Sequence, residues 1–262
     1  MKVKEVEDYI EKELAPLELS LPQDINGLLF GSLDNEVTGI VVCWSPTLKV
    51  IQAAVKGEAN LIVSHEWLIY EHSGSKWTEN ERGVFSKIPN LKRLELLTKH
   101  NISVLKHHSN WDIAPGGITD SFGEFLGFKN VVKKGKVIRI YKEKPRRIKE
   151  LAEEVAAKLD LGCVGFSGDA EKEVEYIGTA VGGLGQILTF ADDFVGTRAE
   201  VLIFGETLEY SAIYTFESGF PFIVTSHEAT EKPGMVKLSQ LLRKKFPRVN
   251  IWYVDSGVPR SF

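Results

Sequence analysis

The sequence predicts an α/β protein built from two similar α/β halves with mostly parallel sheets around a central α+β insertion. Short apolar runs alternate with amphipathic segments in the first and last parts of the chain, as in β-α-β units. The apolar runs at 61–63 and 222–224 are each followed almost at once by Ser-His-Glu. Because open α/β sheets bind ligands beyond the carboxyl ends of their strands, this repeated tripeptide indicates both the fold class and the position of a site.

The first half is expected to begin with a helix and to continue as a β-α-β unit. Apolar residues recur at helical spacing near the start of the chain. Two strands joined by a helical crossover are parallel, and Pro46 fits the first turn of that helix because its missing N–H is not needed there. The expected elements are helices at 1–15, 46–56 and 88–100 and strands at 38–44, 59–63 and 102–106.

Between these elements, residues 66–87 form a mostly polar segment with four aromatic residues and no clear period. A long segment of this kind is more often a functional or flexible loop than regular structure, so we expect a loop here.

The centre of the chain is expected to be a small α+β piece. Residues 136–142 are rich in β-branched residues and alternate between two faces, one of which carries Arg139. Because that face carries a charge, we predict a half-exposed antiparallel strand. An amphipathic helix over 145–159, ended by Gly162, is expected to follow.

In the second half, the glycine-rich segment 182–185 follows a strand and is expected to form a tight loop leading into a helix around Leu188. The segment lacks the spacing of established phosphate-binding loops, so a tight turn is favoured over a phosphate or nucleotide site. The other expected elements are strands at 176–181, 201–204, 222–225 and 249–254 and helices at 208–217 and 233–246. We expect the first half at 1–127, the insertion at 128–175 and the second half at 176–262, with the two halves forming one compact unit.

The composition is that of an ordinary soluble protein, with 43% apolar residues, 26% charged residues and a net charge of -4. The sequence shows no signal peptide and no apolar run long enough to span a membrane. Cys43 and Cys163 form neither a CxxC pattern nor a disulfide framework, so we expect a cytoplasmic protein. The basic stretches at 142–149 and 243–248 are short; either could form a local patch, but nothing indicates a dedicated nucleic-acid surface.

Three segments that pair a histidine with a carboxylate follow apolar runs and are the candidate metal ligands. A histidine and a carboxylate four residues apart in the first turn of a helix face one direction and can bind a single ion together. A bridging carboxylate can hold two ions, and imidazole with carboxylate but no thiolate favours Zn, Fe, Mn or Co. The candidate pairs are His65 with Glu66, His108 with Asp112, and His227 with Glu231.

Other interpretations of these histidines stay open, since a histidine after a strand can cap a helix or bond to the backbone. A single HxxxE or HxxxD also recurs by chance, but three such segments in one chain favour the metal site. We expect His72 and His100 to be surface or capping residues, and we assign no role to the acidic pair at 192–193.

Together these segments resemble the Nif-three-like family of hexameric dinuclear-metal proteins, also named GTP cyclohydrolase 1 type 2 homologs. The resemblance spans nearly the whole chain. It is carried by Asp24-Ile-Asn-Gly27-Leu28, Ser64-His65-Glu66, His108-Ser-Asn-Trp-Asp112, Gly182-Gly-Leu-Gly185 and Ser226-His227-Glu-Ala-Thr-Glu231.

The resemblance implies paired halves that enclose two divalent metal ions, assembled into a toroidal homohexamer. It assigns the family's ligand positions to His65, Asp112, His227 and Glu231. The family's first motif usually has two adjacent histidines, whereas this chain has Glu66 in the second place. The resemblance also implies that His108 lines the site as an extra ligand or a proton carrier.

The leading functional hypothesis is a metal-dependent hydrolase of a small nucleotide-like or phosphorylated substrate, in which Glu66 or His108 moves protons. GTP specificity is not carried over, because the sequence contains no guanine-reading motif. The alternative is a non-catalytic metal-binding protein with a regulatory or scaffold role. A third hypothesis is nucleic-acid binding across an oligomer ring.

Overall fold

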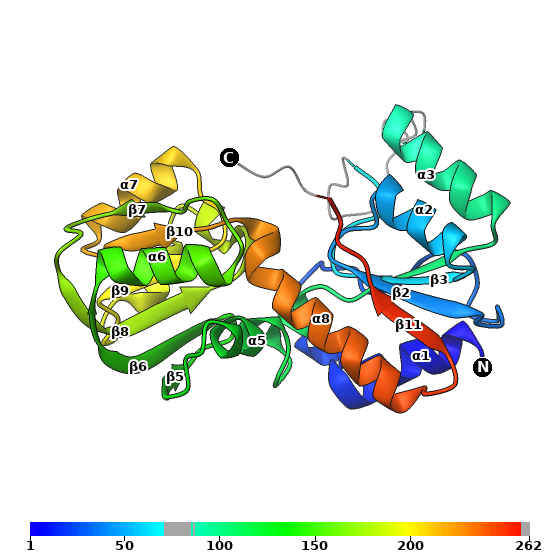
Figure 1. Ribbon diagram of the computed structural model, residues 1–262, viewed down its shortest axis with the longest axis horizontal. Coiled ribbons are helices and arrows are strands. Elements are labelled where there is room, and N and C mark those ends of the chain that lie inside the picture. Colours follow the sequence, from blue (N-terminus) through cyan, green and yellow to red (C-terminus); the bar gives the residue numbers. More distant parts are fainter. Residues whose placement is uncertain (71–84, 86, 258–262) are drawn as a thin grey trace. The chain divides into compact units, whose positions relative to one another are not determined.

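The computed structural model describes residues 1–70, 85 and 87–257, which form two compact units (Figure 1). Unit 1 contains Met1–Gly117 and Met235–Gly257, and unit 2 contains Ile118–Gly234. Each unit has one β-sheet, so the predicted α/β class is confirmed. The loop expected at 66–87 lies mostly outside the described residues.

Unit 1 is built on a five-stranded sheet in the order β1-β4-β3-β2-β11. β1 is antiparallel to β4, and the other neighbouring strands are parallel. β2 and β3 are buried along their whole length, which explains why both read as continuous apolar runs. The strands are β1 (Gly27–Phe30), β2 (Gly39–Cys43), β3 (Leu61–Ser64), β4 (Ser103–Lys106) and β11 (Asn250–Tyr253).

The predicted β-α-β unit is confirmed by α2 (Leu48–Lys56), which connects β2 to the parallel strand β3. This helix begins after Thr47, whose hydroxyl accepts a hydrogen bond from the backbone N–H of Val50. The other helical elements of unit 1 are α1 (Val3–Tyr9), a π-helical turn (Ile10–Leu14), a 3-10 turn (Leu17–Leu19), α3 (Ile88–Lys99) and α4 (Ser109–Ile113).

Unit 2 is built on a mixed six-stranded sheet in the order β5-β6-β8-β9-β10-β7. β8, β9 and β10 are parallel, and the remaining pairs are antiparallel. Three of these strands come from 128–175, which also contains α6 (Ile148–Lys158). The strands are β5 (Val131–Lys134), β6 (Ile138–Arg147), β7 (Gly165–Ser167), β8 (Glu173–Ala180), β9 (Val201–Phe204) and β10 (Phe222–Val224).

β6 is antiparallel to β8 as predicted, but the expectation that one of its faces is exposed is wrong. Arg139 is only 3% exposed, and its Nε donates a hydrogen bond to Asp120 Oδ1 at 2.6 Å. Asp120 lies on α5 (Ile118–Phe125), a helix that the sequence pattern did not indicate. The charge on this face is therefore satisfied by a buried ion pair and not by water.

Helix α6 differs from its expected bounds at both ends. β6 continues through Pro145 to Arg147, and its pairing with β8 shifts register between Lys142 and Arg146, which lets the strand accommodate a proline. At its other end the left-handed residue is Asp160, with a φ of 54°, and not Gly162.

The remaining helices of unit 2 are short. Gly182–Gln186 and Phe190–Phe194 are 3-10 helices, and the residues around Leu188 form a turn instead of the expected helix. The helix expected at 208–217 is confirmed as α7 (Glu209–Glu217).

Helix α8 (His227–Lys245) begins six residues before the position expected from Pro233. The hydroxyl of Ser226 accepts a hydrogen bond from the backbone N–H of Ala229 at 3.2 Å, so this serine caps the earlier start. Pro233 lies inside the helix as a result, and the residues from Met235 onward belong to unit 1. Among the described residues, no helix is both long and apolar enough to cross a membrane.

Candidate metal centre

Unit 1 brings four of the predicted site residues to the carboxyl ends of two neighbouring strands. β3 ends at Ser64 and β4 ends at Lys106, and because these strands are parallel, the segments that follow them lie at the same edge of the sheet. The backbone N–H groups of His65 and Glu66 donate hydrogen bonds to the backbone oxygen of Trp44 at 3.0 and 2.8 Å, and these bonds fix the turn after β3. The residues gathered here are His65, Glu66, His108 and Asp112.

The side chains of this group approach one another closely enough to share an ion. His65, Glu66 and His108 each offer one ligand atom, and these atoms lie within 4.8 Å of one another. His65 Nε2 is 3.6 Å from Asp112 Oδ1, and His108 Nε2 is 3.9 Å from Glu66 Oε1. Both separations exceed hydrogen-bond length. They fit two donors on one ion, since metal–ligand bonds of about 2 Å place such donors about 3–4 Å apart.

Unit 2 brings together the other predicted pair. His227 and Glu231 lie four residues apart in the first turns of α8, just beyond β10. His227 Nε2 is 3.2 Å from Glu231 Oε1, and the glutamate side chain is only 4% exposed. The i, i+4 geometry expected from the sequence is therefore present within this unit.

The three imidazoles of the two groups share one orientation. Nδ1 of each ring lies within hydrogen-bond distance of an oxygen that can only accept, so Nδ1 donates its proton there and Nε2 is the nitrogen that the neutral ring offers as a ligand. In each ring Nε2 also faces a carboxylate of the predicted set. The Nδ1 contacts are His65 to His107 O at 3.1 Å, His108 to Asp24 Oδ2 at 3.1 Å, and His227 to Glu206 Oε1 at 2.7 Å.

Asp24 is the centre of a buried hydrogen-bond network behind His108. Lys106 Nζ, which is fully buried, donates to Asp24 Oδ1 at 2.7 Å and lies 3.7 Å from the ring centroid of Trp67. Burial by itself would raise the pKa of the Asp24 carboxyl, but the contacts with His108 and Lys106 outweigh it and hold that pKa well below its usual range. Asp24 is therefore an ionised carboxylate.

Two carboxylates beside the site have roles that the sequence pattern did not predict. The pattern gives Asp24 no role beyond its place in the family resemblance, and it does not single out Glu206. Glu206 lies two residues after the apolar strand β9 but has no histidine beside it in the sequence, so the pairing of histidine with carboxylate that marked the other segments did not single it out.

The other histidines of the described chain do not join these groups. His107 is fully buried, and burial lowers the pKa of its imidazole to about 3, so the ring is neutral. Its Nδ1 lies 3.3 Å from Nδ2 of Asn110. His100 is the exposed C-cap of α3, as expected, and His72 lies outside the described residues.

The glycine-rich turn that ends β8 packs against the pair on α8. Gly182 has a φ of +59°, and a Cβ atom there would lie 1.9 Å from Glu231 Oε1 and 2.8 Å from His227 Nε2. Its backbone N–H donates to the hydroxyl of Thr230 at 2.8 Å. The close approach to α8 accounts for glycine at this position, in line with the expected tight turn.

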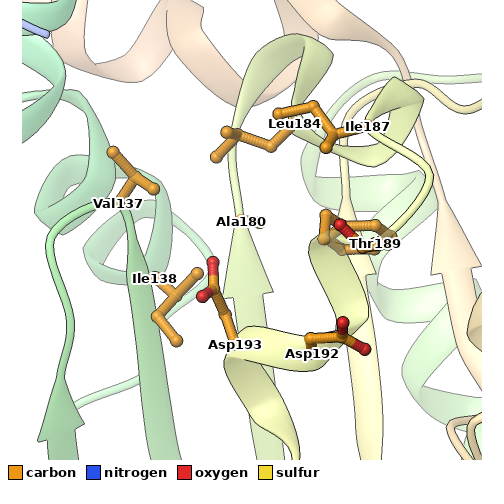
Figure 2. A pocket seen from close by; sticks show the side chains of 9 residues that line it. Val137, Ile138, Ala180, Leu184, Ile187, Thr189, Asp192 and Asp193 are labelled. Carbon is orange, nitrogen blue, oxygen red and sulfur yellow. The ribbon is translucent and has the colours of Figure 1, made fainter.

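Unit 2 also contains a cavity of about 230 Å³ beside this turn. In Figure 2, Val137 and Ile138 lie on one side of the cavity, and Leu184 and Ile187 lie on another. Asp192, at its border, accepts a hydrogen bond from Tyr214 Oη at 2.9 Å. The predicted ligands are not among the residues that line the cavity.

Comparison with known proteins yields matches over nearly the whole chain. A family model described as Duf34/NIF3 (NGG1p interacting factor 3) matches residues 1–257. A Clostridium perfringens protein named GTP cyclohydrolase 1 type 2 homolog is 25% identical over 256 residues, covering 94% of this chain and 92% of that protein. A Methanocaldococcus jannaschii protein with the same name is 26% identical over 248 residues, covering 92% and 95%.

Solved structures share the fold. The structure of the Staphylococcus aureus hypothetical protein SA1388 has a TM-score of 0.82 at 20% identity and covers 100% of this chain and 99% of that one. The structure of a Bacillus cereus protein related to NIF3 has a TM-score of 0.81 at 17% identity and covers 100% and 98%. At these identities the likeness concerns the fold alone.

Proposed function

The chain belongs to the Duf34/NIF3 family, and from that premise we propose that it binds two divalent metal ions and uses them to hydrolyse a small nucleotide-like or phosphorylated molecule. The proposal of hydrolysis is supported by the name of the relatives, GTP cyclohydrolase 1 type 2 homolog, and by the chemistry of the side chains. The proposed ligands are His65, Glu66, His108, Asp112, His227 and Glu231.

The common orientation of the three imidazoles is the observation that carries this proposal. A histidine that binds a metal presents one ring nitrogen to the ion and donates its other N–H to a carboxylate or a carbonyl. His65, His108 and His227 have this arrangement, with the acceptor on Nδ1 and a carboxylate facing Nε2. The residues present therefore fit a metal site of nitrogen and oxygen donors, which suits Zn, Fe, Mn or Co.

Bound divalent ions would lower the pKa of coordinated water toward neutrality and polarise the substrate. The exposure of the side chains distinguishes fixed ligands from groups that can exchange protons with water. His65 is fully buried and suits a fixed ligand, whereas the side chains of Glu66 and His108 are 19% and 29% exposed. Glu66 and His108 are the proposed proton carriers, because they can reach both the site and the surrounding water.

The family resemblance also leads us to propose a homohexamer. Tyr210, Ile213 and Phe216 recur every three residues along α7 and are 80%, 54% and 51% exposed, so the monomer leaves an apolar helix face in water. An exposed apolar face of this kind is typical of a surface that contacts another protein chain, which supports an assembly. Light scattering coupled to size-exclusion chromatography measures the mass directly; a monomer at micromolar concentration would contradict the hexamer.

Elemental analysis of the protein, purified without added metal or chelator, tests the metal site. We expect about two ions per chain, falling sharply in His227→Ala and unchanged in His100→Ala, which removes an exposed histidine outside the two groups. A value near zero, even after reconstitution with Zn, Mn and Fe(II), would overturn the proposal. Full metal content without turnover on any nucleotide or phosphoester would instead favour the regulatory or scaffold role.

A further inference from the structure

Two carboxylates outside the proposed ligand set contact the proposed ligand histidines. Asp24 Oδ2 lies 3.1 Å from Nδ1 of His108, and Glu206 Oε1 lies 2.7 Å from Nδ1 of His227. We propose that Asp24 and Glu206 are positioning residues, each of which fixes the tautomer and the ring orientation of its histidine so that Nε2 is presented to the metal. This inference rests on the proposed metal-binding function.

The network around Asp24 allows only one arrangement. Asp24 Oδ2 accepts hydrogen bonds from the backbone N–H and the hydroxyl of Ser109, in addition to the contact with His108. Asp24 Oδ1 accepts from Lys106 Nζ, so both oxygens face donors. With the carboxylate held on all sides, the His108 ring can satisfy it only by donating from Nδ1.

The backbone of the histidine segment is fixed by the same loop. The backbone N–H of His108 donates to Asn26 Oδ1 at 2.7 Å, and Asn26 Nδ2 donates to Asp24 Oδ2 at 3.2 Å. Ser109 Oγ also accepts from the backbone N–H of Leu21 at 2.9 Å. Both the main chain and the ring of His108 are therefore positioned by residues 21–26.

Glu206 performs the same task for His227 with fewer contacts. Its side chain is 40% exposed, and Gln186 Nε2 donates to the oxygen that receives the His227 contact, at 2.6 Å. The His227 ring therefore contacts the partly exposed Glu206 through Nδ1 and the buried Glu231 through Nε2. Because it lacks the buried network of Asp24, Glu206 can be replaced with less risk to folding.

The test measures metal affinity and histidine tautomer separately in full-length protein. We expect Glu206→Ala to weaken Co(II) and Zn binding about 10–100-fold in competition with a chromophoric chelator, the usual range for a lost partner of a ligating histidine. Glu206→Gln retains an acceptor oxygen and should stay within about threefold of wild type. Glu217→Ala, which removes an exposed glutamate of α7, serves as the control.

A Raman difference spectrum of metal-free protein reports the tautomer without any ion. We expect the Nδ1–H signature of one histidine to be lost in Glu206→Ala and kept in Glu206→Gln, with melting temperatures close to wild type. Asp24→Asn should change the signature of His108 in the same way. Because an amide cannot accept on both sides of this network, Asp24→Asn is also expected to destabilise the chain, so the Glu206 variants provide the decisive comparison.

The possible outcomes distinguish a failure of the positioning role from a failure of the proposed metal binding. If wild type binds metal and Glu206→Ala binds it equally well with an unchanged Raman signature, the positioning role is wrong. An equal loss of affinity in the Ala and Gln variants, or a loss explained by a lower metal-free melting temperature, would overturn it as well. If wild type binds no metal, the proposed function fails, and the Raman spectra alone decide whether Glu206 sets the tautomer.

Discussion

Gly182 and Glu231 approach so closely that a Cβ atom on the glycine would lie 1.9 Å from the carboxylate oxygen Oε1. Any side chain at this position would displace the carboxylate from His227, its neighbour in the proposed ligand set. The turn after β8 is therefore part of the structure that shapes the site in unit 2.

From this contact we expect Gly182→Ala to weaken metal binding by about tenfold or more, the scale on which disturbed ligand partners act. The matched control is Gly196→Ala, since Gly196 also has a positive φ, of 71°, but its Cβ would meet nothing within 4 Å. The control should lose about 1 kcal/mol of stability from backbone strain and keep its metal. Similar metal affinities in the two variants, measured by chelator competition, would refute the steric argument.

Replacement of the proposed proton carrier should separate catalysis from binding. We expect Glu66→Gln to lower kcat about 10²–10⁴-fold, because the amide cannot accept or deliver a proton, while at least one ion per chain remains. Glu95→Gln on the exposed face of α3 is the control. Steady-state assays on the best substrate, with metal content measured on the same samples, provide the comparison. Activity that survives both Glu66→Gln and His108→Ala would exclude the assigned roles.

Breaking the buried ion pair between Arg139 and Asp120 should strongly lower the free energy of unfolding. Arg139→Met leaves the carboxylate buried without its guanidinium and should cost about 3–5 kcal/mol in the free energy of unfolding. The double variant with Asp120→Leu should recover much of this loss, since both charges are then absent. Urea denaturation of wild type, the two single variants and the double variant measures the free energies of unfolding for this double-mutant cycle. The exposed Arg147→Met, whose ion pairs lie in water, should change stability little, and an equal loss there would contradict the expectation.

His107 should make metal-free protein less stable in mild acid. Its folded pKa of about 3 lies below the ordinary value of 6.5, so only the unfolded chain binds this proton between those values. Stability from this group is complete above pH 6.5 and is lost as pH falls, by about 1.4 kcal/mol at pH 5.5. Urea denaturation at pH 7.5 and 5.5 should show a smaller difference in His107→Gln than in wild type or His100→Gln. Equal differences in all three proteins would show that His107 does not contribute.

The fold was predicted best where local signals and packing agree. In unit 1 the strands β2 and β3 are continuous apolar runs joined by a capped helix, and burial on both faces leaves few alternatives. In β6 the prediction of an exposed face failed, because the alternation of apolar and polar residues shows which side chains are polar and not which are exposed. Arg139 looks like a solvent-facing residue until its partner Asp120, 19 residues away in sequence, is placed beside it.

The sequence predicts the candidate ligands of the site but not the residues that contact them from behind. Spacing identifies His227 and Glu231 because both lie on one helix, and strand ends identify His65 and His108. The carboxylates that orient the rings come from distant segments: Asp24 is 84 residues from His108, and Glu206 is 21 from His227. No local periodicity links such pairs, so their roles follow only from the folded contacts. The start of α8 was misplaced for a related reason, since the capping hydroxyl of Ser226 outweighed the local preference of Pro233.

The pairing of β11 with β2 sets the order in which the two units can be completed during synthesis. Unit 2 is continuous from Ile118 to Gly234, whereas the sheet of unit 1 needs Asn250–Tyr253 as its edge strand beside β2. All of unit 2 is therefore synthesised after β1–β4 and before β11, the last strand that the sheet of unit 1 needs. Until then β2 has an open edge, a surface prone to pairing with other chains. The edge of β2 is therefore covered only by a strand that follows unit 2 in the chain.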